Sequence, residues 1–497
     1  MPKPKSFLKE TKSKKKSSQQ QAPRTADEFL AVGVEQEEAG EKWRAGDAAK
    51  SLRFFMRAIA TYDEGLQRHP IAFDLAYNKA RVQYEITQHP RLAAQLSTPL
   101  GEALSVALSS HREALVLEQD NADALFNTAQ VLTSLAEAIT DTKRPIEENL
   151  NQAAKFLQES IDLFQRCLVL QEQKYTEMQV QIRQMESGEV PQPAPEQMQA
   201  QEMQDDGDLK ESEQEQWAAV VEPVTRDTLV DTAIAQLDAL STLCSLLAYD
   251  PGVGLNWVEE YSTDLLHKKV ATFVEGSNRQ YEAGLSRGRF NAALNEVLYR
   301  SGRTDVETYH AAVVTSFSDL NISADPEGLC AKADAFISFN TATAEQPPSN
   351  EPESFSKSLS LRWQALSAAI DALTKASKLP DAENLPKIHL ARGDSEMSRW
   401  RLGFPPWEHD VARQHGPTLL RNAQTYYRGA AALARRDGSA DEDRDGTCKE
   451  AIAAAIEGQK EKLAQLKNTA PKELLAVAED MVEDGWVSGP DMEMLLS

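Results

Sequence analysis

The stretch Ser51-Leu-Arg-Phe-Phe-Met-Arg-Ala58 decides the fold of this chain, because its pattern recurs along the sequence. A small residue is followed four residues later by an aromatic one, and three residues after that by another small one. The further instances are Ala107/His111/Ala114, Ser160/Phe164/Cys167, Ala423/Tyr427/Ala430 and, more loosely, Ala369/Leu373/Ala376. Spacings of four and three place each trio on one face of an α-helix, with small residues where a neighbouring helix approaches closely. The pattern therefore predicts one helix of a packed pair, repeated.

A second phrase marks the partner helix of each pair. The two clear instances are Tyr77-Asn78-Lys79-Ala80 before Tyr84 and Phe126-Asn127-Thr128-Ala129 before Leu132. Ala39 precedes Trp43 at the distance that separates Ala80 from Tyr84. Aligning these phrases predicts that Ala39, Ala80 and Ala129 are equivalent small positions in three successive first helices.

Helical periodicity extends over most of the chain. Apolar residues recur at three and four from Ala26 to about Leu170 and again from Leu229 to the end, and no stretch has the alternation of a strand. The breaks fall at Pro251-Gly252, Asp325-Pro326, Gln346 to Pro352, Pro405-Pro406 and Asp437 to Gly446. The sequence predicts an all-α chain in four segments. These are a disordered basic tail (1–24), N-terminal repeats (25–186), a disordered acidic Gln/Glu-rich insertion (187–216) and C-terminal helical repeats with an acidic end (217–497).

The charge is strongly acidic and unevenly placed. Lys and Arg number 53 against 77 Asp and Glu, a net charge of −24. Residues 1–24 carry +7, so the remaining residues carry −31. An acidic body of this size repels nucleic acid and anionic lipid, so we expect a basic protein partner and no direct nucleic-acid contact. No run approaches 18 apolar residues and none follows the basic start, so we expect neither a membrane span nor a signal peptide.

Motifs for catalysis or cofactor binding are absent from the sequence. It has no phosphate-binding glycine loop, no metalloprotease helix and no nucleophile elbow. The four cysteines lie 77 or more residues apart, which gives no zinc spacing and fits a reduced compartment. Half of a calcium-binding loop is matched by Asp441, Asp443, Asp445 and Gly446. Ile452 occupies the position of the bidentate glutamate, so we interpret this acidic string as a loop between helices. We expect no metal, no cofactor and no enzymatic activity.

These repeated phrases resemble tetratricopeptide repeats, antiparallel helix pairs that stack into a superhelix. Gly46-Asp47, before the first aromatic-bearing helix, matches the inter-helix turn of that family. The small positions are 41 and 49 residues apart instead of the usual 34, so the pairs must be lengthened or carry inserts such as 88–98 and 140–148. The resemblance implies about six to seven repeats with long insertions, and an ordinary helical bundle is the alternative for the second half of the chain.

The resemblance also implies a concave groove lined by the first helix of each pair. The family's lining positions predict a client-binding groove made of Glu37, Trp43, Asp74, Tyr77, Asn78, Tyr84, Glu85, Asp123, Asn127 and Gln130. Only Arg44 and Arg81 are basic there, so a clamp for the acidic tails of heat-shock chaperones is not expected. The acids favour a Lys/Arg-rich ligand, the two asparagines can bond its backbone, and the aromatic rings can stack on guanidinium.

The whole layout resembles the fungal dedicated assembly chaperones of the fourth large-subunit ribosomal protein. That resemblance implies capture of the newly made, basic ribosomal protein by its internal loop and delivery to pre-60S particles, in cytoplasm and nucleus, with an import receptor engaged through the client. Lys12, Lys14, Lys15 and Lys16 are the candidate nuclear import signal. The alternative from the sequence is a scaffold subunit of a larger complex, which would have a salt-insensitive interface and an apolar groove.

Overall fold

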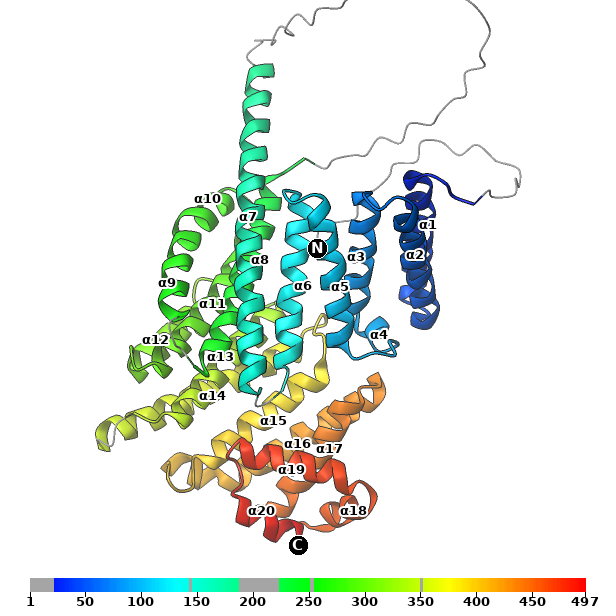
Figure 1. Ribbon diagram of the computed structural model, residues 1–497. Helices are drawn as coiled ribbons and strands as arrows, with labels where there is room; N and C mark the ends of the chain where they lie inside the picture. Colours follow the sequence, from blue (N-terminus) through cyan, green and yellow to red (C-terminus); the bar gives the residue numbers. More distant parts are fainter. Residues whose placement is uncertain (1–21, 143–144, 187–222, 251–253, 349–351) are drawn as a thin grey trace, which may run out of the picture. The chain divides into compact units, whose positions relative to one another are not determined.

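A computed structural model describes residues 22–142, 145–186, 223–250, 254–348 and 352–497 (Figure 1). Within these ranges the ordered elements are helices, and no strand is present. The all-α fold built from tandem helix pairs is therefore confirmed. The tail with Lys12, Lys14, Lys15 and Lys16 and the predicted insertion at 187–216 lie outside the described residues.

The chain divides into two compact units. Unit 1 contains residues 1–239 and 268–277, and unit 2 contains residues 240–267 and 278–497. The helices of unit 1 are α1 (Ala26–Arg44), α2 (Ala48–Arg68), α3 (Phe73–Gln88), α4 (Pro90–Ala93), α5 (Leu100–Leu117), α6 (Ala122–Thr140), α7 (Glu147–Glu186) and α10 (Ala271–Val274). Helix α8 (Arg226–Leu247) contributes its first part to unit 1 and its last part to unit 2.

Unit 2 holds the remaining helices. They are α9 (Gly254–Asp264), α11 (Gln280–Arg300), α12 (Val306–Thr315), α13 (Pro326–Glu345), α14 (Pro352–Ala376), α15 (Leu385–Arg401), α16 (Asp410–Asp437), α17 (Ala440–Ile456), α18 (Glu461–Thr469), α19 (Pro471–Glu483) and α20 (Gly489–Leu496). A π-helical turn, η1 (Leu265–Val270), follows α9 directly.

The helix ends follow from side chains that satisfy the free backbone groups there. Thr25 and Glu28 form a reciprocal capping box at the start of α1. Asp47 caps α2 and Asp325 caps α13, with a proline at the first turn of α13. The predicted break at Asp437 to Gly446 is much shorter than expected. Helix α16 runs to Asp437, Gly438 adopts a left-handed conformation (φ 79°), and α17 begins at Ala440.

The predicted trios form the contact faces of the second helices. In unit 1, α2 packs on α1, α5 on α3, and α7 on α6; in unit 2, α14 packs on α13 and α16 on α15. Phe55, Phe164 and Tyr427 are all buried, and so are the small residues of their trios. Truncating such an aromatic side chain to alanine costs about 3–5 kcal/mol. This part of the sequence-based prediction is confirmed.

Two glycines of the first helices allow the closest approach of an aromatic side chain. A Cβ on Gly33 of α1 would lie 2.1 Å from Cε1 of Tyr62, and a Cβ on Gly393 of α15 would lie 2.4 Å from Cε1 of Tyr427. Real Cβ atoms do not approach other atoms this closely, so glycine is required for α2 and α16 to pack where they do.

Candidate functional site

The register of the first helix pair differs by one residue from the predicted one. The hydroxyl of Ser51 donates to the carbonyl of Gly40 at 2.8 Å, just as the hydroxyl of Ser160 donates to that of Ala129 at 2.8 Å. Gly40 is buried and Ala39 only half-buried. The small position in α1 is therefore Gly40, and the alignment on Ala39 is wrong. The error arose because Ala39 and Trp43 imitate the spacing of Ala80 and Tyr84 on a neighbouring stripe of the helix.

This shift changes which side chains of α1 share a stripe with the lining residues of α3 and α6. Counted from Gly40, the lining positions hold Glu37, Glu38, Glu41 and Arg44. Trp43 lies beside this stripe with 37% of its surface exposed, and the ammonium of Lys50 sits 3.2 Å from its ring centroid. The predicted alignment therefore left out Glu38 and Glu41. The three acidic residues at 37, 38 and 41 could have indicated an acidic stripe on this helix.

The first helices of the three pairs in unit 1 contact one another in chain order, α1 with α3 and α3 with α6. The guanidinium of Arg81 on α3 pairs with the carboxylate of Glu37 on α1. On the other side of α3, Nδ2 of Asn127 on α6 donates to the hydroxyl of Tyr77 at 2.9 Å. The hydroxyl of Tyr84 lies 3.0 Å from that of Ser134. Helices α1, α3 and α6 thus form one continuous layer, held together by polar bonds between far-separated parts of the chain.

Two of the predicted groove acids have internal arginine partners. Glu37 is buried, accepts a hydrogen bond from Tyr62, and pairs with Arg81. Glu85 lies 2.9 Å from Arg44 and 3.2 Å from Arg81. Burial raises the pKa of Glu37, and the Arg81 guanidinium opposes that rise. These two carboxylates are therefore partly neutralised by ion pairs that hold α1 to α3.

Glu41 carries the most perturbed carboxyl of this layer. Burial, together with the neighbouring Glu85 carboxyl, raises the pKa of Glu41 to about 7, and Arg44 and Arg81 oppose the rise. Glu41 lies 2.5 Å from Arg44, and its side chain is 42% exposed. A cation that reaches this carboxyl would compete with its proton near neutral pH.

The other predicted groove residues divide into packing residues and surface residues. Tyr77, Tyr84 and Asn127 are nearly buried and bond across the helices, so they shape the layer more than its surface. Asp74 is exposed, and Asn78 is half-buried with Nδ2 bonded to the Asp74 carbonyl. Asp123 and Gln130 line a hollow between α6, α7 and α8. The structure brings Asp123 and Gln130 together with α8, which sequence reasoning could not place.

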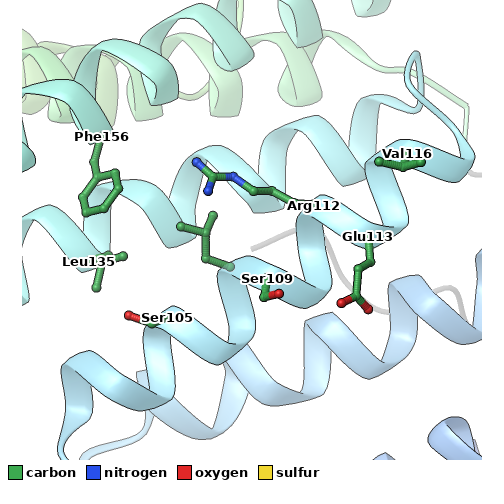
Figure 2. A pocket seen from close by; sticks show the side chains of 8 residues that line it. Ser105, Ser109, Arg112, Glu113, Val116, Leu135 and Phe156 are labelled. Atoms are coloured by element: carbon green, nitrogen blue, oxygen red, sulfur yellow. The ribbon is translucent and has the colours of Figure 1, made fainter.

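A second hollow, of about 430 Å³, lies on the side of unit 1 formed by the second helices (Figure 2). Figure 2 shows Ser105, Ser109, Arg112 and Glu113 of α5 along it, with Leu135 and Phe156 opposite. The Arg112 guanidinium bonds both carboxylate oxygens of Glu159, at 2.9 and 2.7 Å. The charge of Arg112 is thereby matched, and the remaining lining is Glu113, two serines and apolar surface, which favours no particular chemistry.

The acidic string and the four cysteines lie in the part of the chain that the structure describes. No group of three or more His, Cys, Asp or Glu side chains there is arranged to hold a metal ion. The acidic string at Asp441 to Gly446 is helical, so the interpretation as a loop between helices is wrong. It is an acidic first turn of α17, where carboxylates stabilise the positive end of the helix dipole. Cys167 and Cys244 are buried as predicted, and burial raises the pKa of each thiol to about 12.

Helix α8 alone, among the described residues, is long and apolar enough by composition to cross a membrane. Just over half of its apolar window, 56%, is buried against the rest of the protein. Core helices of globular proteins show the same combination.

The fold and this layer of first helices define an all-α protein of tandem helix pairs. No family model matches the chain. It is 26% identical over 427 residues to the Schizosaccharomyces pombe protein described as UPF0656 protein C926.02, covering 82% of this chain and 84% of that one. It is 30% identical over 87 residues to the Saccharomyces cerevisiae protein described as uncharacterized protein YNL193W, covering 17% and 16% of the two chains.

Among solved structures, the chain is similar to a circular tandem repeat protein with novel repeat topology and enhanced subunit contact surfaces. The identity is 13%, the match covers 93% of this chain and 99% of that one, and the TM-score is 0.27. A TM-score of this size carries no argument, so the fold assignment rests on the helices described above.

Proposed function

We propose that this chain binds a basic segment of another protein across α1, α3 and α6 and acts as its chaperone. The observation that carries the proposal is the charge of this layer once the register is corrected. Its lining positions hold six carboxylates against the guanidiniums of Arg44 and Arg81; the acids are Glu37, Glu38, Glu41, Asp74, Glu85 and Asp123. Even with Glu37 and Glu85 paired internally, the surface keeps an excess of negative charge.

The physical argument is competition for the client's charges. A Lys/Arg-rich segment made to contact ribosomal RNA binds other RNA through non-specific phosphate contacts. An acidic surface inside a body of net charge −31 over residues 25–497 offers the same cations an alternative and attracts them from a distance. The complex releases its client where the client's own RNA competes more strongly.

The client and the destination of the complex are proposed from the resemblance noted in the sequence. The tetratricopeptide-like repeats, basic start and acidic finish resemble those of the dedicated assembly chaperones of the fourth large-subunit ribosomal protein. In this proposal the client is that protein's basic internal loop, the destination is the pre-60S particle, and the complex passes from cytoplasm to nucleus. An import receptor would be engaged through the client.

The scaffold alternative is favoured by one specific observation. Glu37 and Glu85 form ion pairs with Arg81 and Arg44, which lowers the free charge of the layer. A layer of lower charge would suit packing against a helix of another subunit. A scaffold interface would bury apolar surface and would bind with little dependence on salt.

The test is a fluorescence anisotropy titration at low and moderate salt with two labelled peptides, the basic loop and an acidic heat-shock tail. The double variant Glu38→Lys/Asp74→Lys changes exposed acids of the layer that have no role in the Arg44 and Arg81 pairs. Its matched control is Glu102→Lys/Glu113→Lys, which makes the same charge change at exposed positions on α5. We expect salt-sensitive binding of the basic loop that falls about tenfold or more in the first variant only. Salt-insensitive binding, or an equal loss in both variants, would refute the proposal.

A further inference from the structure

The hollow between α6, α7 and α8 has the size and composition of a side-chain pocket. Its volume is about 210 Å³, and it is lined from three helices that the sequence separates by up to 115 residues. Three aspartates face it: Asp123 from α6, and Asp231 and Asp238 from α8. Each of these carboxylates also interacts within the chain, so a ligand would share them. They fall short of a metal site, because they do not approach one another as a ligand set would.

Amide groups in the same hollow point to a hydrogen-bonding ligand. Oε1 of Gln130 is buried and accepts no hydrogen bond. Gln171 is only 4% exposed, and its Oε1 accepts a hydrogen bond from Thr232 at 2.7 Å. A buried acceptor without a donor costs free energy that a bound N–H group would recover. The pocket therefore offers an acceptor, Oε1 of Gln130, to a cationic donor.

The remaining wall is apolar. Phe126 is 5% exposed and packs edge-on against Phe164, with ring centroids 5.4 Å apart. Ile234 and Ala235 of α8 complete that wall. A long side chain with an alkyl stem and a charged planar head matches this division into an apolar wall and an acidic opening.

We infer that this hollow receives one arginine side chain of the bound segment. The guanidinium would bridge carboxylates of α6 and α8, donate to Oε1 of Gln130, and lay its planar face on Phe126. Arginine suits the hollow better than lysine because its fork of donors reaches acceptors on two helices at once. The inference rests on the proposed function and adds a specific contact, made by α8, that lies outside the predicted groove.

The test uses three labelled peptides of identical Gly/Ser background that carry three arginines, three lysines or three citrullines. Citrulline keeps the shape of arginine without its charge. The hollow variant is Asp231→Asn/Asp238→Asn, and its control is Asp227→Asn, an exposed position in the first turn of α8 that does not line the hollow. We expect the arginine peptide to bind wild-type protein most tightly, and the hollow variant to lose about tenfold in affinity while the control changes little.

A second variant protects the test from a folding artefact. Gln130→Leu removes the unpartnered acceptor, so it should weaken arginine binding without lowering the unfolding midpoint. Equal affinity of the arginine and lysine peptides, or wild-type affinity in the hollow variant, would overturn the inference. If that happens while Glu38→Lys/Asp74→Lys still loses binding, the proposed function stands without the pocket. If no cationic peptide binds the wild-type protein, both fail.

Discussion

Replacing His111 by phenylalanine should remove a specific part of the protein's acid sensitivity. His111 fills the aromatic position of its trio on α5, where the equivalent residues are Phe55, Phe164 and Tyr427. It is fully buried beside Tyr84, with ring centroids 6.3 Å apart, and neither ring nitrogen makes a well-formed hydrogen bond. Burial, together with the Arg81 guanidinium, lowers the pKa of His111 to about 4, while the nearby Ala80 backbone opposes the shift.

The magnitude follows from proton linkage. In the unfolded chain a histidine has a pKa of about 6.5, so between pH 6.5 and 4 the unfolded state binds more protons than the folded one. Stability from this group is complete above pH 6.5 and falls as the pH falls. With these two pKa values the loss at pH 5 is about 2 kcal/mol relative to pH 7.5. Carboxyl groups elsewhere also titrate, so the quantity to compare is the difference between wild type and variant.

Urea unfolding followed by far-ultraviolet circular dichroism at pH 7.5 and 5 measures this difference. We expect wild-type protein to lose about 2 kcal/mol more than His111→Phe over that interval. The reciprocal change Phe164→His places a histidine in the equivalent position on α7 and should add a similar loss. Parallel loss of stability in wild type and His111→Phe would refute the reasoning, since it would mean that His111 is protonated without cost in the folded state.

Three further predictions follow from the contacts described above. Gly33→Ala places a Cβ 2.1 Å from the Tyr62 ring and should destabilise unit 1 by about 1–3 kcal/mol. Gly101→Ala, which has open space around its Cβ position, should be neutral or stabilising. The urea unfolding midpoints of the two variants are compared with that of the wild-type protein. Affinity for a basic peptide should rise by up to about tenfold from pH 6 to pH 8 because a bound cation favours ionised Glu41, and Glu41→Gln should flatten that profile in anisotropy titrations. Lys449→Met should lower the free energy of unfolding, measured by heat or urea, by about 3–5 kcal/mol, because Asp394 would lose contacts of 2.8 and 3.1 Å to a buried ammonium. An unchanged unfolding midpoint would show that the hydrogen bond from Tyr427 alone satisfies that carboxylate.

The candidate site was only partly visible in the sequence. Asp123 and Gln130 were found because they repeat, on α6, positions that Asp74 and Arg81 occupy on α3. Glu38 and Glu41 were missed because the alignment of α1 was one residue out, and such a shift moves every lining side chain to another stripe. The contribution of α8 could not be found by repeat spacing, since more than fifty residues separate Gln171 from Thr228.

The helices, the trios that pack them and the acidic character of the chain could all be predicted from the sequence. Those features are local, because the spacing of apolar and small residues along 3.6-residue turns selects the buried face before any partner is known. The packing of helices, in contrast, determines that Gly40 lies under Ser51, that Arg81 pairs with Glu37 and Glu85, and that α8 closes a hollow over Phe126. These facts depend on which distant side chains approach within hydrogen-bond or van der Waals range, and such distances are set by the stacking of whole helices.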